Sequence, residues 1–395
     1  MKYDFNTIIP RRGTGCVKWD RPVDGMTVEA MNDVIPMWVA DMDFAVAPAI
    51  QEAIRSRAAH PVYGYTEVGD DYYEAVISWF RRRHDWTIHR EEIIHVTGVV
   101  PAMSVAVKAL AMPGENVLIL SPDYNCFFSS IRNNGCQVAE TVLVFRNGRF
   151  EVDWDDFEAK CADEKTTVFL LCSPHNPTGR VWTPEELERM NDICLRHGVK
   201  VVSDEIHCEL VMPGHRFQPF AAVSEQCRRN CVVLNSPSKS FNIAGLMTAN
   251  IICSQSEWRR RLNRVVNIYE LCDLNPFGPV ALVAAYNESE DWIDELNVYL
   301  WQNYQALCRF VAERLPRLKV FPMEGTYLPW VDVSALGLTS KTLCDRLMVE
   351  GHVWVNPGTM YGPESGEGFI RLNIACPRSQ MMEGLERMEK VLKQL

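Results

Sequence analysis

The 395-residue sequence has no apolar stretch long enough to span a membrane. Its longest apolar runs, such as residues 279–285, fall well short of the roughly 20 residues that cross a bilayer. The first residues, MKYDFNTIIPRR, also lack the apolar segment of a signal peptide. We therefore expect a cytoplasmic protein that does not bind to membranes.

Basic residues are fewer than acidic ones. The sequence has 40 Lys and Arg against 51 Asp and Glu, which gives a formal net charge of −11. This charge argues against nucleic acid as the main partner. The 14 cysteines show no repeated spacing, so we interpret them as reduced thiols rather than as disulfides or zinc ligands. With 47% hydrophobic and 23% charged residues, the chain is typical of a globular protein. Its length favours two domains.

Five short runs of apolar and β-branched residues predict strands buried on both faces of a sheet. The runs are residues 116–121, 166–173, 199–205, 231–236 and 249–254. Helical patterns lie between them, which predicts a parallel or mostly parallel sheet.

Helix signals are clearest in TPEELERMNDICLRHG, where Thr183 is a candidate N-cap, Pro184 occupies the first helical position and Glu186 completes a capping box. We expect this helix to end at Gly198. Apolar residues at helical spacing over residues 293–315 predict a long amphipathic helix. The remaining C-terminal sequence alternates strand-like and helical runs, which suggests a separate α+β domain.

Polar residues follow several predicted strands, where ligands of open α/β sheets bind. Asn176 lies in the turn PHNPTGR after one strand, and Asp204 and Glu205 follow the next. A turn asparagine or a helix cap would explain each of them separately. However, a carboxylate at a buried strand end is costly without a cationic partner.

Two further segments could hold an anion or an activated amine. Ser236, Ser238 and Lys239 fall within four residues after a predicted strand, and two hydroxyls beside a lysine suit a phosphate. In VTGVVPAM a strand leads into a helix. The amides of Gly98, Val99 and Val100 would then face an anion at the helix N-terminus.

The order and spacing of these residues resemble the pyridoxal-phosphate enzymes of the aspartate-aminotransferase fold, because Asn176, Asp204 and Lys239 end successive strands 28 and 35 residues apart. The resemblance covers nearly the whole chain. It implies an α/β fold with a large domain, residues 45–288, built on a mostly parallel mixed sheet between helices. Residues 1–44 and 289–395 would form a smaller α+β domain.

The same resemblance implies a role for each candidate. Lys239 would bind pyridoxal 5'-phosphate covalently as a Schiff base, and Asp204 would pair with the ring nitrogen. The Gly98 loop with the two serines would hold the phosphate. Asn176 would bond the ring hydroxyl and also contact the substrate, while Tyr124 in SPDYNCF would stack on the ring and assist catalysis.

Two more assignments come from the resemblance. Arg371 in GFIRLNIACPR would clamp the carboxylate of an amino-acid substrate, since a guanidinium offers a bidentate fork. Tyr65 in VYGYTEVG, or less favourably Tyr63, would reach the cofactor phosphate of a neighbouring subunit. The protein would then be a homodimer with shared active sites.

One branch of the family fits best. The segments ADMDFAVAP, VYGYT, CSPHNPTGRVWT, SDEIH and SKSFNIAGL resemble cystathionine β-lyases and cysteine-S-conjugate β-lyases of the MalY/PatB type. His207 and Met247 replace the tyrosine and the phosphate-binding arginine that aminotransferases commonly carry, and we place His207 among the cofactor-binding residues. Asp41 and Tyr361 are expected in the substrate pocket.

This resemblance implies α,β-elimination of L-cystathionine or another S-substituted L-cysteine to a thiol such as homocysteine, pyruvate and ammonia. The enzyme would act in methionine synthesis or in the breakdown of sulfur amino acids. Two alternatives stay open. An aminotransferase would share the cofactor residues but depend on a 2-oxo acid, and a regulatory protein could use this fold to bind a transcription factor.

Overall fold

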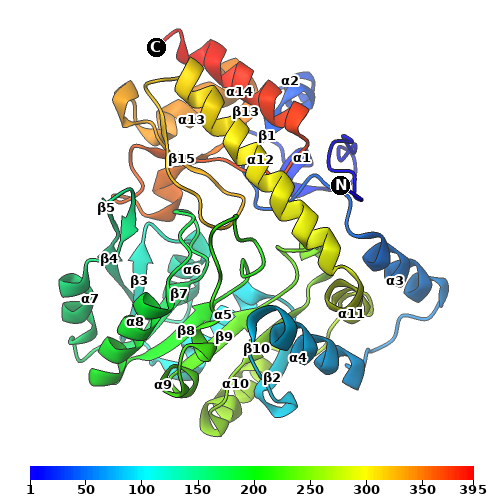
Figure 1. The fold of residues 1–395 in the computed structure, drawn as a ribbon, viewed down its shortest axis with the longest axis vertical. Coiled ribbons are helices and arrows are strands. Elements are labelled where there is room, and N and C mark those ends of the chain that lie inside the picture. Colours follow the sequence, from blue (N-terminus) through cyan, green and yellow to red (C-terminus); the bar gives the residue numbers. More distant parts are fainter.

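Seven strands form the largest sheet of the computed structural model, which describes residues 1–395 (Figure 1). Their order across the sheet is β2-β10-β9-β8-β7-β3-β4. The strands are β2 (Ile93–Val96), β3 (Asn116–Ser121), β4 (Gln137–Val142), β7 (Thr166–Cys172), β8 (Lys200–Asp204), β9 (Cys231–Asn235) and β10 (Ala249–Ile252). All five predicted strands are present. Only β10 runs antiparallel to its neighbours, so the sheet is mixed but mostly parallel, as predicted.

Helices cover both faces of this sheet, which explains why its strands are apolar without interruption. Successive strand residues point to opposite faces, so Leu118 and Leu120 join one core cluster while Val117 and Ile119 join the other. The smaller cluster also takes residues of α5 (Val99–Leu110), α6 (Asn125–Asn133) and α10 (Ser256–Ile268). The larger takes residues of α3 (Pro48–Ala59), α4 (Asp70–His84), α7 (Trp154–Cys161), α8 (Pro184–Arg196), α9 (Glu225–Arg229) and α11 (Gly278–Glu288).

Helix α8 shows how local sequence sets an element boundary. The Thr183 hydroxyl accepts from the Glu186 amide, and the Glu186 carboxylate accepts from the Thr183 amide, so the predicted capping box is formed. The helix stops at Arg196, two residues before the expected end, because Gly198 already adopts a left-handed φ of 71°.

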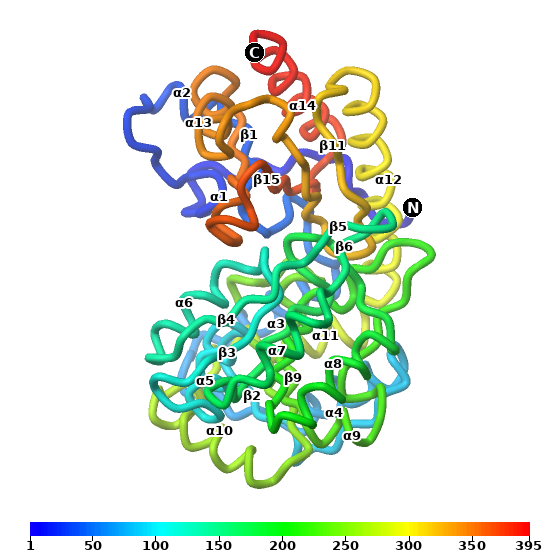
Figure 2. The backbone as a smooth tube through the Cα atoms, turned by 90° about the vertical axis from the view of Figure 1, so that its left-hand side faces the viewer, coloured from blue at the N-terminus to red at the C-terminus, as the bar shows by residue number.

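The C-terminal part contains a four-stranded sheet of order β11-β12-β15-β14, seen at the top of Figures 1 and 2. Its strands are β11 (Lys319–Val320), β12 (Trp330–Asp332), β14 (Asn356–Pro357) and β15 (Phe369–Arg371). The predicted long helix is α12 (Glu290–Arg314), which runs from α11 to this sheet, and α13 (Ser340–Gly351) and α14 (Arg378–Leu392) complete the part. An α+β arrangement therefore follows α12.

The N-terminal segment lies against this C-terminal part. It contains α1 (Val17–Asp20), α2 (Val28–Asp33) and β1 (Ile35–Pro36), and β1 pairs with β13 (Val353–Trp354) in a two-stranded parallel sheet. The run HVWVNPG, which we expected to be one strand, is divided between β13 and β14 because the two halves pair with different partners. The domain boundaries after residues 44 and 288 stay a prediction.

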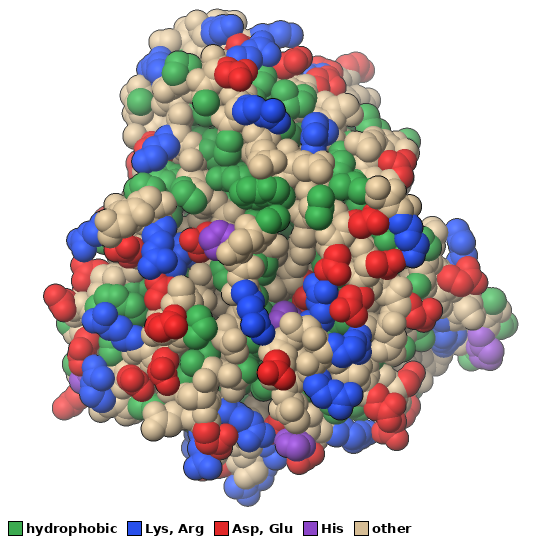
Figure 3. Space-filling view, in the orientation of Figure 1, with side chains coloured by type: hydrophobic (Ala, Val, Ile, Leu, Met, Phe, Trp, Pro, Cys, Tyr) green, Lys and Arg blue, Asp and Glu red, His purple; other side chains and the backbone are tan.

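The remaining elements are short. Strands β5 (Val144–Arg146) and β6 (Arg149–Glu151) form a hairpin. Five 3-10 helices span Arg90–Glu92, Phe220–Ala222, Ala244–Leu246, Ser334–Leu336 and Gly358–Tyr361. No helix combines the length and the apolar character needed to cross a bilayer. Acidic and basic side chains alternate over the face in Figure 3, with hydrophobic side chains gathered where its upper and lower parts meet.

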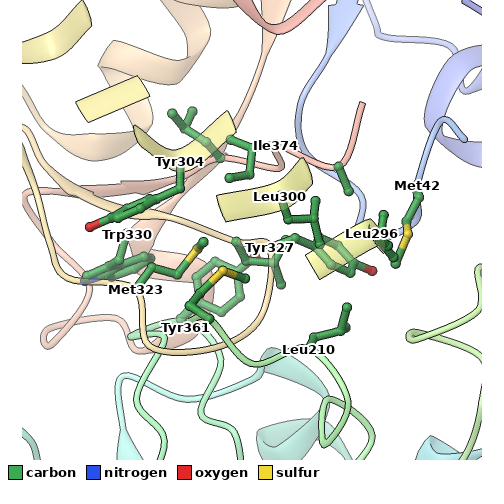
Figure 4. Packing of buried hydrophobic residues seen from close by; sticks show 14 of the residues in the cluster. Met42, Leu210, Leu296, Leu300, Tyr304, Met323, Tyr327, Trp330, Tyr361 and Ile374 are labelled. Atoms are coloured by element: carbon green, nitrogen blue, oxygen red, sulfur yellow. The ribbon is translucent and has the colours of Figure 1, made fainter. Parts of the chain in front are cut away.

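The larger core cluster is continuous between the two parts of the molecule. Figure 4 shows Tyr327 inside it, with Leu296 and Leu300 of α12 to one side and Leu210 below. All four residues are fully buried. This packing fixes the position of the C-terminal part over the edge of the large sheet.

Candidate active site

A cavity of about 250 Å³ lies at the carboxyl edge of the large sheet. Strands β2, β7, β8 and β9 run in the same direction, so the residues that follow them meet at this edge. Of the predicted site residues, the following line the cavity: Gly98, Val99, Val100, Tyr124, Asn176, Asp204, His207, Ser238 and Lys239. The fold therefore brings together most of the residues that the sequence suggested.

Lys239 lies in the loop after β9, and its amine donates a 2.6 Å hydrogen bond to the carbonyl of Ala40. Burial lowers the pKa of this amine, while the charge of Asp41 acts in the opposite direction and that of Arg371 adds to the lowering. A lysine whose pKa is depressed is more often neutral at physiological pH. It can therefore act as a nucleophile or as a general base.

Asp204 ends β8 and is almost completely buried. Its Oδ1 accepts a 3.1 Å hydrogen bond from the Ile206 amide. Burial raises the pKa of this carboxyl to about 7, although the Ile206 amide and the charge of Lys239 offset part of the effect. The carboxylate would be stabilised by a cationic ligand group in the cavity.

Gly98 is the N-cap of α5, and no side chain caps this helix end. The first amides of the helix are thus available to an anion, and the twelve-residue helix adds its dipole. Ser238 also lines the cavity, whereas Ser236 does not. The Ser236 hydroxyl bonds instead to the Ser238 hydroxyl and to the carbonyl of Thr248, so Ser236 lies behind Ser238.

Arg371 reaches the site from the end of β15 and is buried. It donates to the Asn176 side-chain oxygen at 3.1 Å and to the Trp38 carbonyl at 2.8 Å. Its Nε is buried without a hydrogen-bond partner, so the guanidinium still has donors for a ligand. The guanidinium carbon Cζ of Arg371 lies 4.7 Å from the ring centroid of Tyr361, so Tyr361 packs beside the arginine.

His207 lines the cavity and is buried, and its Nδ1 has no hydrogen-bond partner. Burial lowers the pKa of the imidazole to about 3, with smaller contributions from the charges of Lys239 and Arg371. The ring is therefore neutral. Its Nδ1 is free to bond a ligand. The Tyr327 ring packs edge-on against the imidazole, with 6.1 Å between the two ring centroids.

The other predicted residues lie around this cavity or away from it. Tyr124 lines it as the N-cap residue of α6. Tyr65 is 97% exposed and contributes nothing to the cavity of its own chain, whereas Tyr63 packs on Phe277 and bonds the Ala58 carbonyl. Asp41 follows Ala40 and pairs with Arg11 at 2.7 Å. The functional roles of all these residues stay predictions.

Sequence reasoning missed the contribution of backbone carbonyls. Ala40 lines the cavity, and its carbonyl accepts from Lys239 and, at 2.9 Å, from the hydroxyl of Tyr327. The Trp38 carbonyl likewise accepts a hydrogen bond from Arg371. No side-chain pattern reveals such acceptors. The only sequence indication was that the segment ADMDFAVAP belongs to the family pattern.

Comparison with known proteins agrees with this geometry. The family model described as aminotransferase class I and II matches residues 32–388. The chain belongs to the class I and II aminotransferase family. Cystathionine beta-lyase PatB of Bacillus subtilis is 39% identical over 389 residues, which are 98% of this chain and 100% of PatB. Protein MalY of Escherichia coli is 35% identical, covering 97% of each chain.

The fold is also shared with a solved structure that contains pyridoxal 5'-phosphate. The crystal structure of cystalysin from Treponema denticola, which contains a pyridoxal 5'-phosphate cofactor, has a TM-score of 0.94 and 34% identity over all of both chains. The predicted family and the predicted fold class are therefore confirmed. Of these relatives, PatB carries the name of a cystathionine beta-lyase.

Proposed function

We propose that this protein is a pyridoxal-phosphate-dependent carbon–sulfur β-lyase that acts on L-cystathionine or other S-substituted L-cysteines. The observation that carries the proposal is the juxtaposition of Lys239, Asp204 and Arg371 at one edge of the sheet. Whole-length similarity to PatB, whose name describes a cystathionine β-lyase, favours this branch over an aminotransferase.

The residues present fit pyridoxal phosphate. The uncapped N-terminus of α5 with Ser238 offers amide and hydroxyl donors to a phosphate. The buried Asp204 carboxyl, with its raised pKa, matches the protonated nitrogen of a pyridine ring. The unpartnered Nδ1 of His207 supplies a further polar contact. When bound, the cofactor takes up the electron pair left at the substrate α-carbon.

Lys239 moves the proton in this mechanism. When its amine is free and neutral, Lys239 would remove the substrate α-proton as a general base. Burial favours the neutral form, because it lowers the lysine pKa. The carbonyl of Ala40 accepts a hydrogen bond from the Lys239 amine and so holds the amine in place.

Elimination then breaks the bond between the β-carbon and sulfur. The thiolate leaves with the bonding electron pair, and a double bond forms between the α- and β-carbons. Hydrolysis of the remaining three-carbon unit gives pyruvate and ammonia. Arg371 holds the α-carboxylate through the donors that Asn176 and Trp38 leave free.

The proposal extends to assembly and location. Tyr65 is almost fully exposed in a single chain, which suits a residue that completes the phosphate site of a second subunit. We therefore propose a cytoplasmic homodimer with shared active sites. Mixing Tyr65→Phe and Lys239→Ala subunits would test it, because only a shared site gives hybrid dimers that regain activity.

The function is tested by incubating the cofactor-loaded enzyme with L-cystathionine in the absence of any 2-oxo acid. Pyruvate and free thiol should appear in equal amounts. If product forms only after a 2-oxo acid is added, the protein is an aminotransferase and the proposal is wrong. A matched reaction with Lys239→Ala controls for background reaction with free cofactor.

A further inference from the structure

A second cavity adjoins the catalytic one on the side of the N-terminal segment. This side cavity, of about 550 Å³, is lined by residues that include Arg11, Thr14, Asp41, Asn242, Ala244 and Gly245. Ala244 lines both cavities, and the wall between them contains Ala40 of the catalytic cavity and Asp41 of the side cavity. The side cavity therefore begins one residue from the carbonyl that holds Lys239.

Hydrogen bonds of Asn242 hold the wall between the cavities. Asn242 donates to the carbonyls of Met42 and Phe44 and accepts from the Met42 amide, at distances of 2.9 to 3.1 Å. These bonds clamp the segment after Asp41 onto the loop that follows Lys239. These bonds thus set the position of the side cavity relative to Lys239.

An opposite-charge pair faces this cavity. Arg11 and Asp41 lie 2.7 Å apart, and each side chain is 22% exposed. Two neighbouring charges, Lys18 and Asp43, are only 1–2% exposed and are paired with each other at 2.8 Å. Among these four charges, Arg11 and Asp41 are therefore the ones that a ligand can reach.

Arg11 has unused hydrogen-bond donors. Arg11 uses both Nη1 protons, on the Met42 carbonyl and on Asp43, and one Nη2 proton on Asp41. The edge formed by Nε and Nη2 makes no other bond in the structure, and this edge can receive a carboxylate through two parallel hydrogen bonds. Asp41 uses Oδ2 for Arg11, and its Oδ1 is buried 3.6 Å from the Lys18 amine, so a ligand ammonium would contact Asp41 through Oδ2.

We propose that the side cavity binds the distal end of the substrate, and that Arg11 and Asp41 select S-substituted cysteines whose leaving group carries its own α-amino acid. Arg11 binds the distal carboxylate, and Asp41 faces the distal ammonium. The inference rests on the proposed function, because it takes the cysteine half to be held by Arg371 and Lys239. L-Cystathionine has such a leaving group, whereas S-propyl-L-cysteine has neither distal charge.

The test compares kcat/KM for L-cystathionine, S-(3-carboxypropyl)-L-cysteine and S-propyl-L-cysteine, measured as pyruvate release by the cofactor-loaded enzyme. We expect the parent enzyme to prefer the two substrates with a distal carboxylate by at least about tenfold, the effect of one charge-assisted hydrogen bond. Arg11→Gln should remove this preference and leave S-propyl-L-cysteine within about twofold of the parent value. Asp41→Asn should lower kcat/KM for L-cystathionine more than for S-(3-carboxypropyl)-L-cysteine.

Lys18→Met is the matched control, because it also removes one positive charge from Asp41 and Asp43 but lies outside the side cavity. It should leave the preference for S-(3-carboxypropyl)-L-cysteine over S-propyl-L-cysteine, which depends on Arg11 alone, unchanged. If Arg11→Gln fails to fold, Arg11→Lys keeps the charge and loses the free edge, and should still reduce the preference several-fold.

An unchanged preference in the Arg11 variants, or no preference in the parent enzyme, would overturn the inference while leaving the lyase function intact. No pyruvate from any of the three substrates would instead overturn the proposed function, and the inference with it.

Discussion

Replacing Arg371 with leucine should weaken the enzyme mainly through the loss of its bonds to the substrate carboxylate. The guanidinium is buried, donates to Asn176 and to the Trp38 carbonyl, and retains a buried Nε without a partner. A charge-assisted hydrogen bond contributes about 1.5–3 kcal/mol. Loss of a two-bond clamp therefore costs about 3–6 kcal/mol, or roughly 10²- to 10⁴-fold in kcat/KM. Arg371→Lys keeps the charge but loses the fork, so its loss should lie at about 10- to 100-fold.

The assay is steady-state pyruvate formation from L-cystathionine, with cofactor binding measured separately from the visible absorbance. Arg378→Lys is a suitable control, because Arg378 lies seven residues later on the same segment and bonds Asn303 and Gln302 away from the cavity. This control should keep kcat/KM within about twofold of the parent enzyme. If Arg371→Leu also stays within threefold while cofactor remains bound, the carboxylate clamp has been assigned to the wrong residue.

Three other changes probe the site and its support. Lys239→Ala should abolish turnover and the absorbance of lysine-bound cofactor, and measurable pyruvate formation would exclude Lys239 as the base. Asp204→Asn should stabilise the cofactor-free protein above pH 7, because a pKa near 7 in place of 3.8 costs up to about 4 kcal/mol when the buried acid ionises. Thermal unfolding should show this gain shrinking as pH falls from 7 and absent below pH 3.8, and a uniform gain would contradict it. Glu209 is buried, yet His84 at 2.7 Å and Arg83 outweigh that burial and lower its pKa to about 2. Glu209→Gln should therefore cost about 3–5 kcal/mol at neutral pH, seen as a lower unfolding temperature with little change in KM. The wild-type advantage should fade as pH falls from 4.5 towards 2.

The parts of the fold that the sequence predicts well depend on local or periodic patterns. Strands β3, β7, β8, β9 and β10 are apolar throughout because helices cover both faces of their sheet. Helix α8 was found from its capping box and its proline. The division of HVWVNPG into β13 and β14 could not be predicted, since it depends on pairing with β1 and β15, which are far away in the sequence.

The candidate site divides in the same way. Lys239, Asp204 and Asn176 were found because each follows a strand that can be recognised from the sequence. The Ala40 carbonyl and its Tyr327 partner were not, because a backbone oxygen has no sequence signature and the two residues are 287 positions apart. Arg11 was missed because only the fold brings it to Asp41, 30 positions away in the sequence.

The most direct test of the central claim follows the substrate nitrogen. L-Cystathionine labelled with ¹⁵N on its cysteine half is incubated with the cofactor-loaded enzyme and an excess of a 2-oxo acid, and labelled ammonium, free thiol and any new amino acid are measured together. The account predicts one labelled ammonium for each thiol and no label in the amino acid derived from the 2-oxo acid. Label in that amino acid, without thiol release, would show amino transfer and contradict β-elimination as the function of this protein.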